Sequence, residues 1–232
     1  MGISRIFKDF VRLFYPNLCM VCHNDLAAGE SVICTSCLYY IPRTKYWYDA
    51  ENPVAKIFWG RVMVQNACSF FFFAKGSRYR KLLHHLKYSG KKEIGFALGK
   101  EFGYELNRGR LYEKIDFIVP VPLHPKRLKQ RGYNQAEEIA KGLEESMGLP
   151  ISTENLVREG YTETQTRKTR TERVKNVSKA FRLRKPNEFE GKHILLVDDV
   201  VTTGATLEEC ATVVLEAEDA KVSIVTLAYA SL

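Results

Sequence analysis

The segment that most constrains the fold lies near the carboxyl terminus, where residues 194–206 read ILLVDDVVTTGAT. Four apolar residues predict a buried strand, and two adjacent acids, Asp198 and Asp199, follow at its carboxyl end. Small and hydroxylated residues come next, and an amphipathic helix begins directly after them. This order predicts an α/β domain, in which the carboxyl ends of the strands form the ligand-binding edge.

The same segment has the chemistry to hold a ribose 5-phosphate. Free N–H groups at the start of a helix bind phosphate, and a glycine lets the ligand approach the backbone closely. The two carboxylates accept hydrogen bonds from a sugar diol or help to hold a hydrated Mg2+. We therefore expect a phosphorylated ribose, such as phosphoribosyl pyrophosphate (PRPP), as the ligand. Its phosphate-binding residues are Thr202, Thr203, Gly204, Ala205 and Thr206.

Three other interpretations of this segment compete. A Walker B strand also ends in acids, but the nearest Walker A candidate, GFALGKE at 95–101, is one residue short and lacks the Ser or Thr. The acidic pocket of a receiver domain does not explain the Thr-Thr-Gly loop. The last alternative is a strand–turn–helix without a ligand, and a chance run of this composition is improbable.

Four of the six cysteines form a doubled motif, in which Cys19-x2-Cys22 is followed after eleven residues by Cys34-x2-Cys37. Two such pairs predict a tetrahedral Zn2+ site with four thiolate ligands. Such a site is structural, because it leaves no position open for water or substrate. Disulfides or buried thiols are the alternatives, and disulfides need an oxidising compartment. His23 is expected to be a bystander beside the complete ligand set.

The positive charge is concentrated in one part of the chain. The formal charge is +8, and residues 121–185 hold 15 Lys and Arg against 8 Glu and no Asp. This stretch therefore accounts for +7 of the total and is expected to form an anion-binding surface.

Alternating strand and helix patterns predict a largely parallel sheet. The predicted strands lie within 61–74, 115–121, 194–197 and 222–230, and the predicted helices cover 78–88, 94–106, 136–147 and the residues after 206. We expect three parts: an N-terminal helix and zinc ribbon at 1–45, a connector at 46–60, and an α/β domain at 61–232.

Further segments complete a recognisable pattern: LKYSG at 86–90, PVPLHPKRLKQRGYNQA at 120–136 and QTRKTRTERVKNVSKAF at 165–181. With the cysteine pairs and residues 194–206, they resemble the ComF family over most of the chain. That family joins a zinc ribbon to a type I phosphoribosyltransferase domain and is associated with DNA uptake in natural transformation. The resemblance implies a phosphoribosyltransferase-like fold, PRPP with Mg2+ as ligand, and a structural Zn2+.

The resemblance also implies roles for individual residues. Asp198 and Asp199 would bind the ribose hydroxyls, and residues 202–206 the 5′-phosphate. The pyrophosphate-binding loop would correspond to the segment after the 115–121 strand, which carries His124, Lys126, Arg127 and Arg131. Residues 165–181 would correspond to a lid over PRPP, with Arg167, Lys168, Arg170 and Arg173 facing the diphosphate. The catalytic candidates are Asp198, Asp199 and Arg167.

The N-terminal segment shows no secretory signal, and no apolar run reaches the length of a membrane span. We therefore expect a cytoplasmic protein without membrane insertion. Apolar residues in 3–14 repeat with helical spacing, which indicates a helix on the protein's own core or, alternatively, one on a membrane surface or a partner.

Three functions fit these observations. The chain is a competence protein that handles single-stranded DNA and works with other proteins of DNA uptake, a phosphoribosyltransferase with an unknown acceptor, or a regulator that senses PRPP without consuming it. The residues expected to contact nucleic acid are Arg127, Lys129, Arg131, Tyr133, Lys168, Arg170 and Arg173.

Overall fold

The computed structural model describes residues 16–74, 76–158 and 180–230. Its centre is a four-stranded sheet in the order β1-β6-β5-β2, and every neighbouring pair is parallel. The strands are β1 (Ala67–Phe72), β2 (Phe117–Pro120), β5 (His193–Val201) and β6 (Lys221–Tyr229). The expected α/β class with a parallel sheet is confirmed.

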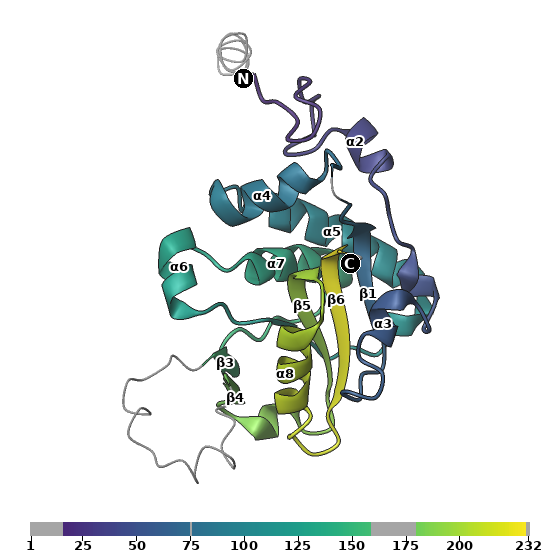
Figure 1. Cartoon of the computed structure of the whole chain (residues 1–232), viewed down its shortest axis with the longest axis vertical. Helices are drawn as coiled ribbons and strands as arrows, with labels where there is room; N and C mark the ends of the chain where they lie inside the picture. Colours follow the sequence, from purple (N-terminus) through teal and green to yellow (C-terminus); the bar gives the residue numbers. More distant parts are fainter. Residues whose placement is uncertain (1–15, 75, 159–179, 231–232) are drawn as a thin grey trace.

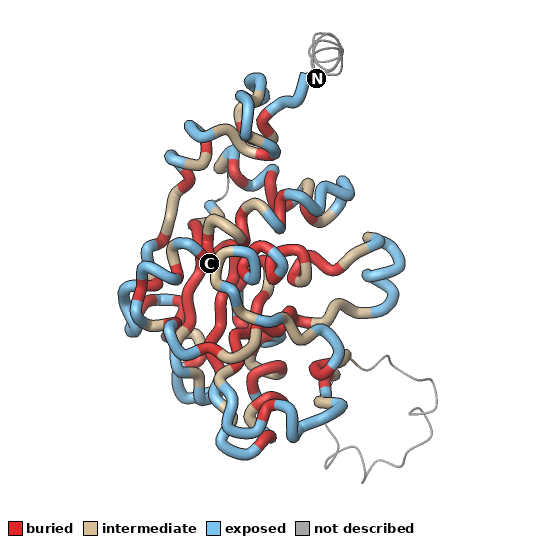
Figure 2. Tube along the Cα trace, turned by 180° about the vertical axis from the view of Figure 1, so that it is seen from behind, coloured by how far each residue is buried: buried red, intermediate tan, exposed pale blue. Residues whose placement is uncertain are grey.

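The two faces of the sheet are covered by different helices, and β5 shows why. Its residues 194–197 are all buried, because alternate side chains point to opposite faces. Leu195 and Val197 join one apolar core, and Ile194 and Leu196 join another. The first core contains α5 (Glu93–Arg108) and α7 (Gln135–Met147), and the second contains α8 (Ala205–Val214). Figure 2 shows this buried centre within an exposed outer layer.

Helices α5 and α7 pack with their backbones in close contact. An added Cβ at Gly142 would overlap the carbonyl oxygen of Phe96, and one at Gly99 would overlap that of Ile139. Both glycines are therefore needed for this approach. The side chain of Asn134 caps α7 by accepting from the N–H of Ala136 at 3.1 Å, and this fixes the entry to the helix.

The remaining elements are short. They are α2 (Thr35–Tyr39), η1 (Tyr46–Tyr48), α3 (Pro53–Lys56), α4 (Arg80–Tyr88), η2 (Arg110–Tyr112), α6 (Pro125–Arg131), β3 (Leu156–Arg158), β4 (Phe181–Leu183) and η4 (Pro186–Phe189). Figure 1 places α2 at one end of the molecule and the antiparallel β3–β4 pair at the other. None of the helices in these described parts has the length and apolar content needed to span a bilayer.

Two expectations differ in detail from the structure. Residues 61–74, which predict one or two strands, contain one strand that begins at Ala67, and residues 61–66 lie outside any strand. Residues 46–60, expected as a connector, contain η1 and α3, and they bury Trp47 and Phe58 in the two cores. The aromatic residues of this segment therefore serve to pack it against the sheet.

Candidate functional site

Two adjacent acids lie at the carboxyl end of β5, because the strand continues past the buried apolar run to Val201. Asp199 is buried, and Asp198 is largely shielded from solvent as well. The backbone N–H of Asp199 donates to Oδ1 of Asp198 at 2.8 Å. The acids are therefore held at the ligand-binding edge of the sheet, where residues 194–206 predicted them.

Lys87 supplies the cation for this pair. Its Nζ lies 3.0 Å from Oδ2 of Asp199, and both side chains are largely shielded from solvent. Lys87 is in the last turn of α4, far from β5 in sequence. Lys87 is not among the site residues predicted from the sequence, and its place in the LKYSG segment at 86–90 is the one sequence signal that points to it.

The environment of Asp198 favours its protonated form. Burial raises the pKa of Asp198 to about 7, and the negative charge of Asp199 acts in the same direction. The backbone N–H of Asp199 and the positive charges of Lys87 and Arg131 lower it, but they do not outweigh the burial. The site thus contains a carboxyl group that changes charge near neutral pH.

The loop after β5 presents the N-terminus of α8 without a side-chain cap. Gly204 is the N-cap, has a left-handed backbone with φ of 75°, and makes no capping hydrogen bond. A Cβ there would lie 2.7 Å from Cγ2 of Ile57, so only glycine fits. Arg61 holds the loop by donating to the carbonyl of Thr203 at 2.8 Å and by pairing with Glu208. Free N–H groups at this helix end suit an anion.

A cavity of about 120 Å3 joins the acids to this helix end and to several cations. Of the residues nominated from the sequence, Asp198, Asp199, Thr206, Arg127 and Arg131 line it. The lining residues that the sequence analysis did not nominate include Lys87, Asn134, Gln135 and Arg158. Thr202 and Thr203 are exposed in the adjoining loop, and Ala205 is exposed at the first position of α8.

Helix α6 carries the cations of the 120–136 segment, and none of its residues is buried. His124 is its N-cap, and Nδ1 accepts from the N–H of Lys126 at 3.1 Å. Neither His124 nor Lys126 lines the cavity. Arg131 donates to Oε1 of Gln135 at 2.6 Å, and its guanidinium lies 5.4 Å from the centre of the Tyr88 ring.

The remaining residues nominated for nucleic acid divide into two groups. Lys129 is exposed on α6, whereas Tyr133 packs against the core and its hydroxyl donates to the carbonyl of Leu86. Arg167, Lys168, Arg170 and Arg173 lie outside the described residues.

The four cysteines of the doubled motif come together at the amino-terminal end of the described chain. The sulfur atoms of Cys19, Cys22, Cys34 and Cys37 all lie within 4.8 Å of one another, and none is in a disulfide. Cys19 accepts from the N–H of Val21 at 3.5 Å and from that of Cys34 at 3.4 Å. Four converging sulfurs with N–H donors fit a tetrahedral divalent ion.

Backbone N–H donors and burial act on the pKa values of these thiols in opposite directions. Burial acts to raise the pKa of Cys19, but backbone N–H groups of Cys22, Cys34 and Val21 outweigh it and bring the value to about 7. Burial raises the pKa of both Cys34 and Cys37. Four thiolates at this distance repel one another unless a metal ion neutralises them.

Comparison with known proteins agrees with this geometry. Residues 98–231 match the family described as phosphoribosyl transferase domain. DNA utilization protein YhgH of Salmonella typhimurium is 31% identical over 222 residues, which cover 91% of this chain and 96% of that protein. Competence protein ComFC of Bacillus subtilis is 35% identical over 138 residues, covering 59% of this chain and 53% of that protein. Competence protein F of Haemophilus influenzae is 40% identical over 93 residues, covering 40% and 41%.

Among solved structures, the glutamine PRPP amidotransferase of B. subtilis matches 60% of this chain and 29% of that one, with 19% identity and a TM-score of 0.42. That likeness is too distant to transfer residues or activity. The family match covers more than half of the chain, and the YhgH similarity extends over nearly all of it. The chain therefore belongs to the phosphoribosyl transferase domain family, with its type I fold, and within that family to the ComF-like proteins.

Proposed function

We propose that this chain binds PRPP at the carboxyl end of β5. The observation that carries the proposal is the cavity in which Asp198 and Asp199 lie beside the uncapped N-terminus of α8. The carboxylates would accept from the ribose hydroxyls, and residues 202–206 would bind the 5′-phosphate.

The diphosphate would lie against the cations of the same cavity. Lys87, Arg127, Arg131 and Arg158 line it, and Mg2+ would bind together with the ligand. Arg167 remains a candidate for a lid over the diphosphate. His124 and Lys126 would contribute only to the positive field around the entrance, because neither lines the cavity.

Calorimetry with PRPP and Mg2+ tests the proposal. The variant Asp198→Asn/Asp199→Asn keeps the shape of the site but removes two acceptor charges, so it should lose measurable binding. Asp219→Asn is the matched control, because this exposed acid lies in the turn before β6, at the other end of the sheet, and Asn tolerates its left-handed backbone. Equal affinity of the wild-type protein and the double variant would refute the roles given to the acids.

Two activities could follow from PRPP binding. In a transferase, the bond between the anomeric carbon and the pyrophosphate breaks, and an acceptor atom bonds to that carbon while Mg-pyrophosphate leaves. In a sensor, PRPP binds and is not consumed. Pyrophosphate release in the presence of a panel of nucleobases separates the two, since a transferase with one of these acceptors releases pyrophosphate above background and a sensor does not.

We also propose that the chain handles single-stranded DNA in the cytoplasm, in support of DNA uptake. The supporting observation is α6, which exposes Lys126, Arg127 and Lys129 and contains no acidic residue. The names of the related competence and DNA utilization proteins agree with this role. Absence of binding to an oligonucleotide at low salt would dispose of the proposal.

The cysteine cluster is proposed to hold one structural Zn2+. Its four thiolates would complete the tetrahedral shell, so the ion would stabilise the amino-terminal module and take no part in catalysis. The module has few buried residues of its own, and the metal would therefore supply much of its stability.

A further inference from the structure

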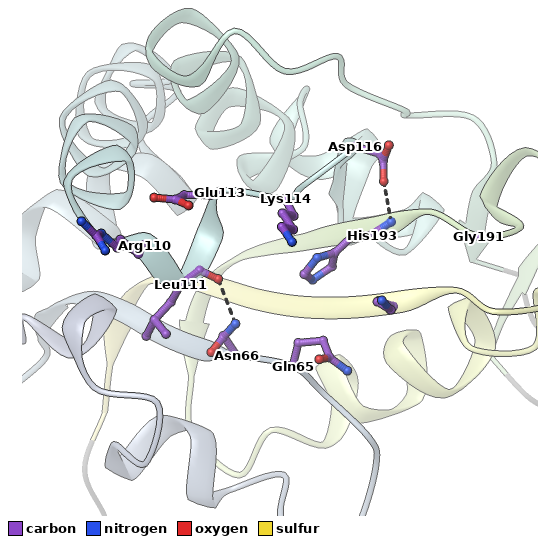
Figure 3. A pocket seen from close by; sticks show the side chains of 10 residues that line it. Gln65, Asn66, Arg110, Leu111, Glu113, Lys114, Asp116, Gly191 and His193 are labelled. Atoms are coloured by element: carbon purple, nitrogen blue, oxygen red, sulfur yellow. Dashed lines mark hydrogen bonds between the residues drawn. The ribbon is translucent and has the colours of Figure 1, made fainter.

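A second cavity, of about 320 Å3, lies at the opposite end of the sheet from the acids. It is formed at the amino ends of β5 and β6, between the segment that precedes β1 and the segment around η2. Figure 3 shows His193, Lys114, Arg110 and Gln65 around this opening, which we call the amino-end cavity. Its volume is at the lower end of the range of about 300–1,000 Å3 for small-molecule sites.

The walls of the amino-end cavity are fixed by hydrogen bonds. The backbone N–H of His193 donates to Oδ2 of Asp116 at 2.8 Å, and Nε2 of His193 lies 2.9 Å from Oγ of Ser223. The side-chain amide of Asn66 donates to the carbonyl of Leu111 at 2.9 Å, as Figure 3 shows. These bonds involve four separate segments of the chain, so the cavity is preformed.

The charges around the amino-end cavity do not cancel. Among the described residues, Arg110, Lys114 and Lys221 have no acidic partner. Asp116 is already engaged, because it accepts from His193 and lies 3.4 Å from Nζ of Lys192.

Glu113 is the remaining acid of the lining, and it is exposed without a partner among the described residues. Three free cations and one free acid leave a surplus of two positive charges. Burial lowers the pKa of His193, so the ring is neutral at pH 7 and adds no charge.

We propose that the amino-end cavity binds a phosphate dianion, either free or as the phosphate group of a small monoester. A phosphate group carries about −1.5 to −2 charges at neutral pH, which balances the surplus of two. Lys114 and Lys221 supply point charges, and Arg110 supplies a planar fork of N–H donors that matches phosphate oxygens. The amide of Gln65 adds a neutral donor.

This cavity is separate from the PRPP site. His193 and Asp198 are five residues apart on one strand, which corresponds to roughly 17 Å at about 3.3 Å per residue. A ribose phosphate at one end of β5 therefore leaves the other end free. A phosphate bound at the amino-end cavity is expected to be detected locally, at the imidazole of His193.

The test is an NMR titration that follows the His193 imidazole, which is one of only five histidines. Ribose 5-phosphate and inorganic phosphate are the two probes. We expect a saturable shift of the His193 resonances, and at least tenfold weaker binding in Lys114→Gln/Lys221→Gln. The matched control is Lys56→Gln/Lys81→Gln, which also removes two exposed lysine charges but lines neither cavity.

The relative affinities of the two probes distinguish a phosphate monoester from the free phosphate ion. Tighter binding of ribose 5-phosphate identifies a monoester as the ligand, and equal affinity of the two probes identifies the free ion. Unshifted His193 resonances, or equal weakening in both double-lysine variants, would overturn the proposal. Equal weakening in both variants would mean that only the overall charge of the chain attracts the anion. Circular dichroism of both variants checks that they remain folded.

Discussion

Asp198 and Asp199 are adjacent carboxyl groups in a cavity with limited access to water, and they cannot both ionise freely. Asp199 has Lys87 at 3.0 Å, so its charge is compensated. Among the described residues, Asp198 has no cation this close, and burial together with the charge of Asp199 raises its pKa to about 7. Asp198 therefore keeps its proton below about pH 7 and releases it near neutral pH or when a cationic ligand such as Mg2+ arrives.

The first prediction concerns pH. If the ribose hydroxyls need an ionised Asp198, affinity for Mg-PRPP should rise about tenfold per pH unit below pH 7 and level off above about pH 8, because one proton is released on binding. Calorimetry between pH 5 and pH 9 measures this. A flat profile would contradict the role given to Asp198.

The same shift predicts a change in stability. The folded-state pKa of Asp198 lies above its ordinary value of 3.8, so the folded chain binds more protons than the unfolded chain between about pH 4 and pH 7. Stability therefore falls as pH rises through this window. Asp198→Asn should raise the melting temperature at pH 8 and have little effect at pH 4, and thermal unfolding at both values checks it.

Lys87 carries the third prediction. Lys87→Gln leaves the buried Asp199 without its cation, so the free energy of unfolding should fall by about 1–3 kcal/mol in urea titrations. It should also move the midpoint of the pH profile for Mg-PRPP upward, because Lys87 lowers the pKa of Asp198. If the pH dependence came instead from titration of the phosphates of PRPP, the midpoint would be the same in Lys87→Gln and in the wild-type protein.

The control for Lys87 is another ion pair of similar length. Lys141→Gln removes the partner of Glu138, which lies 2.7 Å away, but this lysine is half exposed. A loss of less than about 1 kcal/mol is expected there. Equal losses in the two variants would mean that burial of the Lys87–Asp199 pair has no effect.

The site residues differ in how far the sequence could predict them. Asp198, Asp199 and Thr206 were predicted because strand, acids, loop and helix follow one another directly. Lys87 and Arg158 come from α4 and β3, and only the packing of these elements brings them to the cavity. A pattern of neighbouring residues in the sequence cannot predict such a contact, because it joins elements that are far apart in the chain. His124 lies outside the cavity because its side chain caps helix α6. A loop, and not a helix, was expected for this segment.

At the scale of elements, long helices and buried strands were predictable because they repeat apolar residues over several turns or form continuous runs. Helix α6 has seven residues and buries none of them, so it has no such periodicity. Strands β3 and β4 have three residues each, and their pairing joins segments on either side of residues 159–179. The strand order β1-β6-β5-β2 likewise depends on long-range packing.

The cluster of four cysteines gives the fourth prediction. Metal analysis of protein purified without chelator should find about one zinc per chain, and removal of the metal under reducing conditions should lower the melting temperature. His23→Asn is the control, since His23 is outside the ligand set and Asn tolerates its φ of 62°. Absence of zinc would refute the assignment, and loss of zinc in the control would show that His23 is a ligand.

At the scale of the whole molecule, the parallel sheet has two polar ends with different charges. The carboxyl end combines two acids with the cations of α4, α6 and β3, and the amino end combines Glu113 and Asp116 with the cations Arg110, Lys114 and Lys221. Helix α6 extends from the carboxyl end, as Figure 1 shows. Arg127 and Arg131 line the cavity beside Asp198 and Asp199, whereas Lys126 and Lys129 are exposed outside it. A nucleic acid that follows α6 would therefore pass beside the site proposed for PRPP.

The last prediction uses this arrangement. If single-stranded DNA binds along α6, the logarithm of its binding constant should fall linearly with the logarithm of salt concentration, with a slope of about 0.7 for each phosphate contact. Lys126→Gln/Lys129→Gln should then reduce the slope by about 1.4, because two contacts are lost. Fluorescence anisotropy with a labelled oligonucleotide between low and moderate salt measures this slope.

The control variant Lys114→Gln/Lys221→Gln removes the same charge at the other end of the sheet and should keep the wild-type slope. If both variants lowered the slope equally, the DNA would not be following α6, since a diffuse attraction depends on net charge and not on its position.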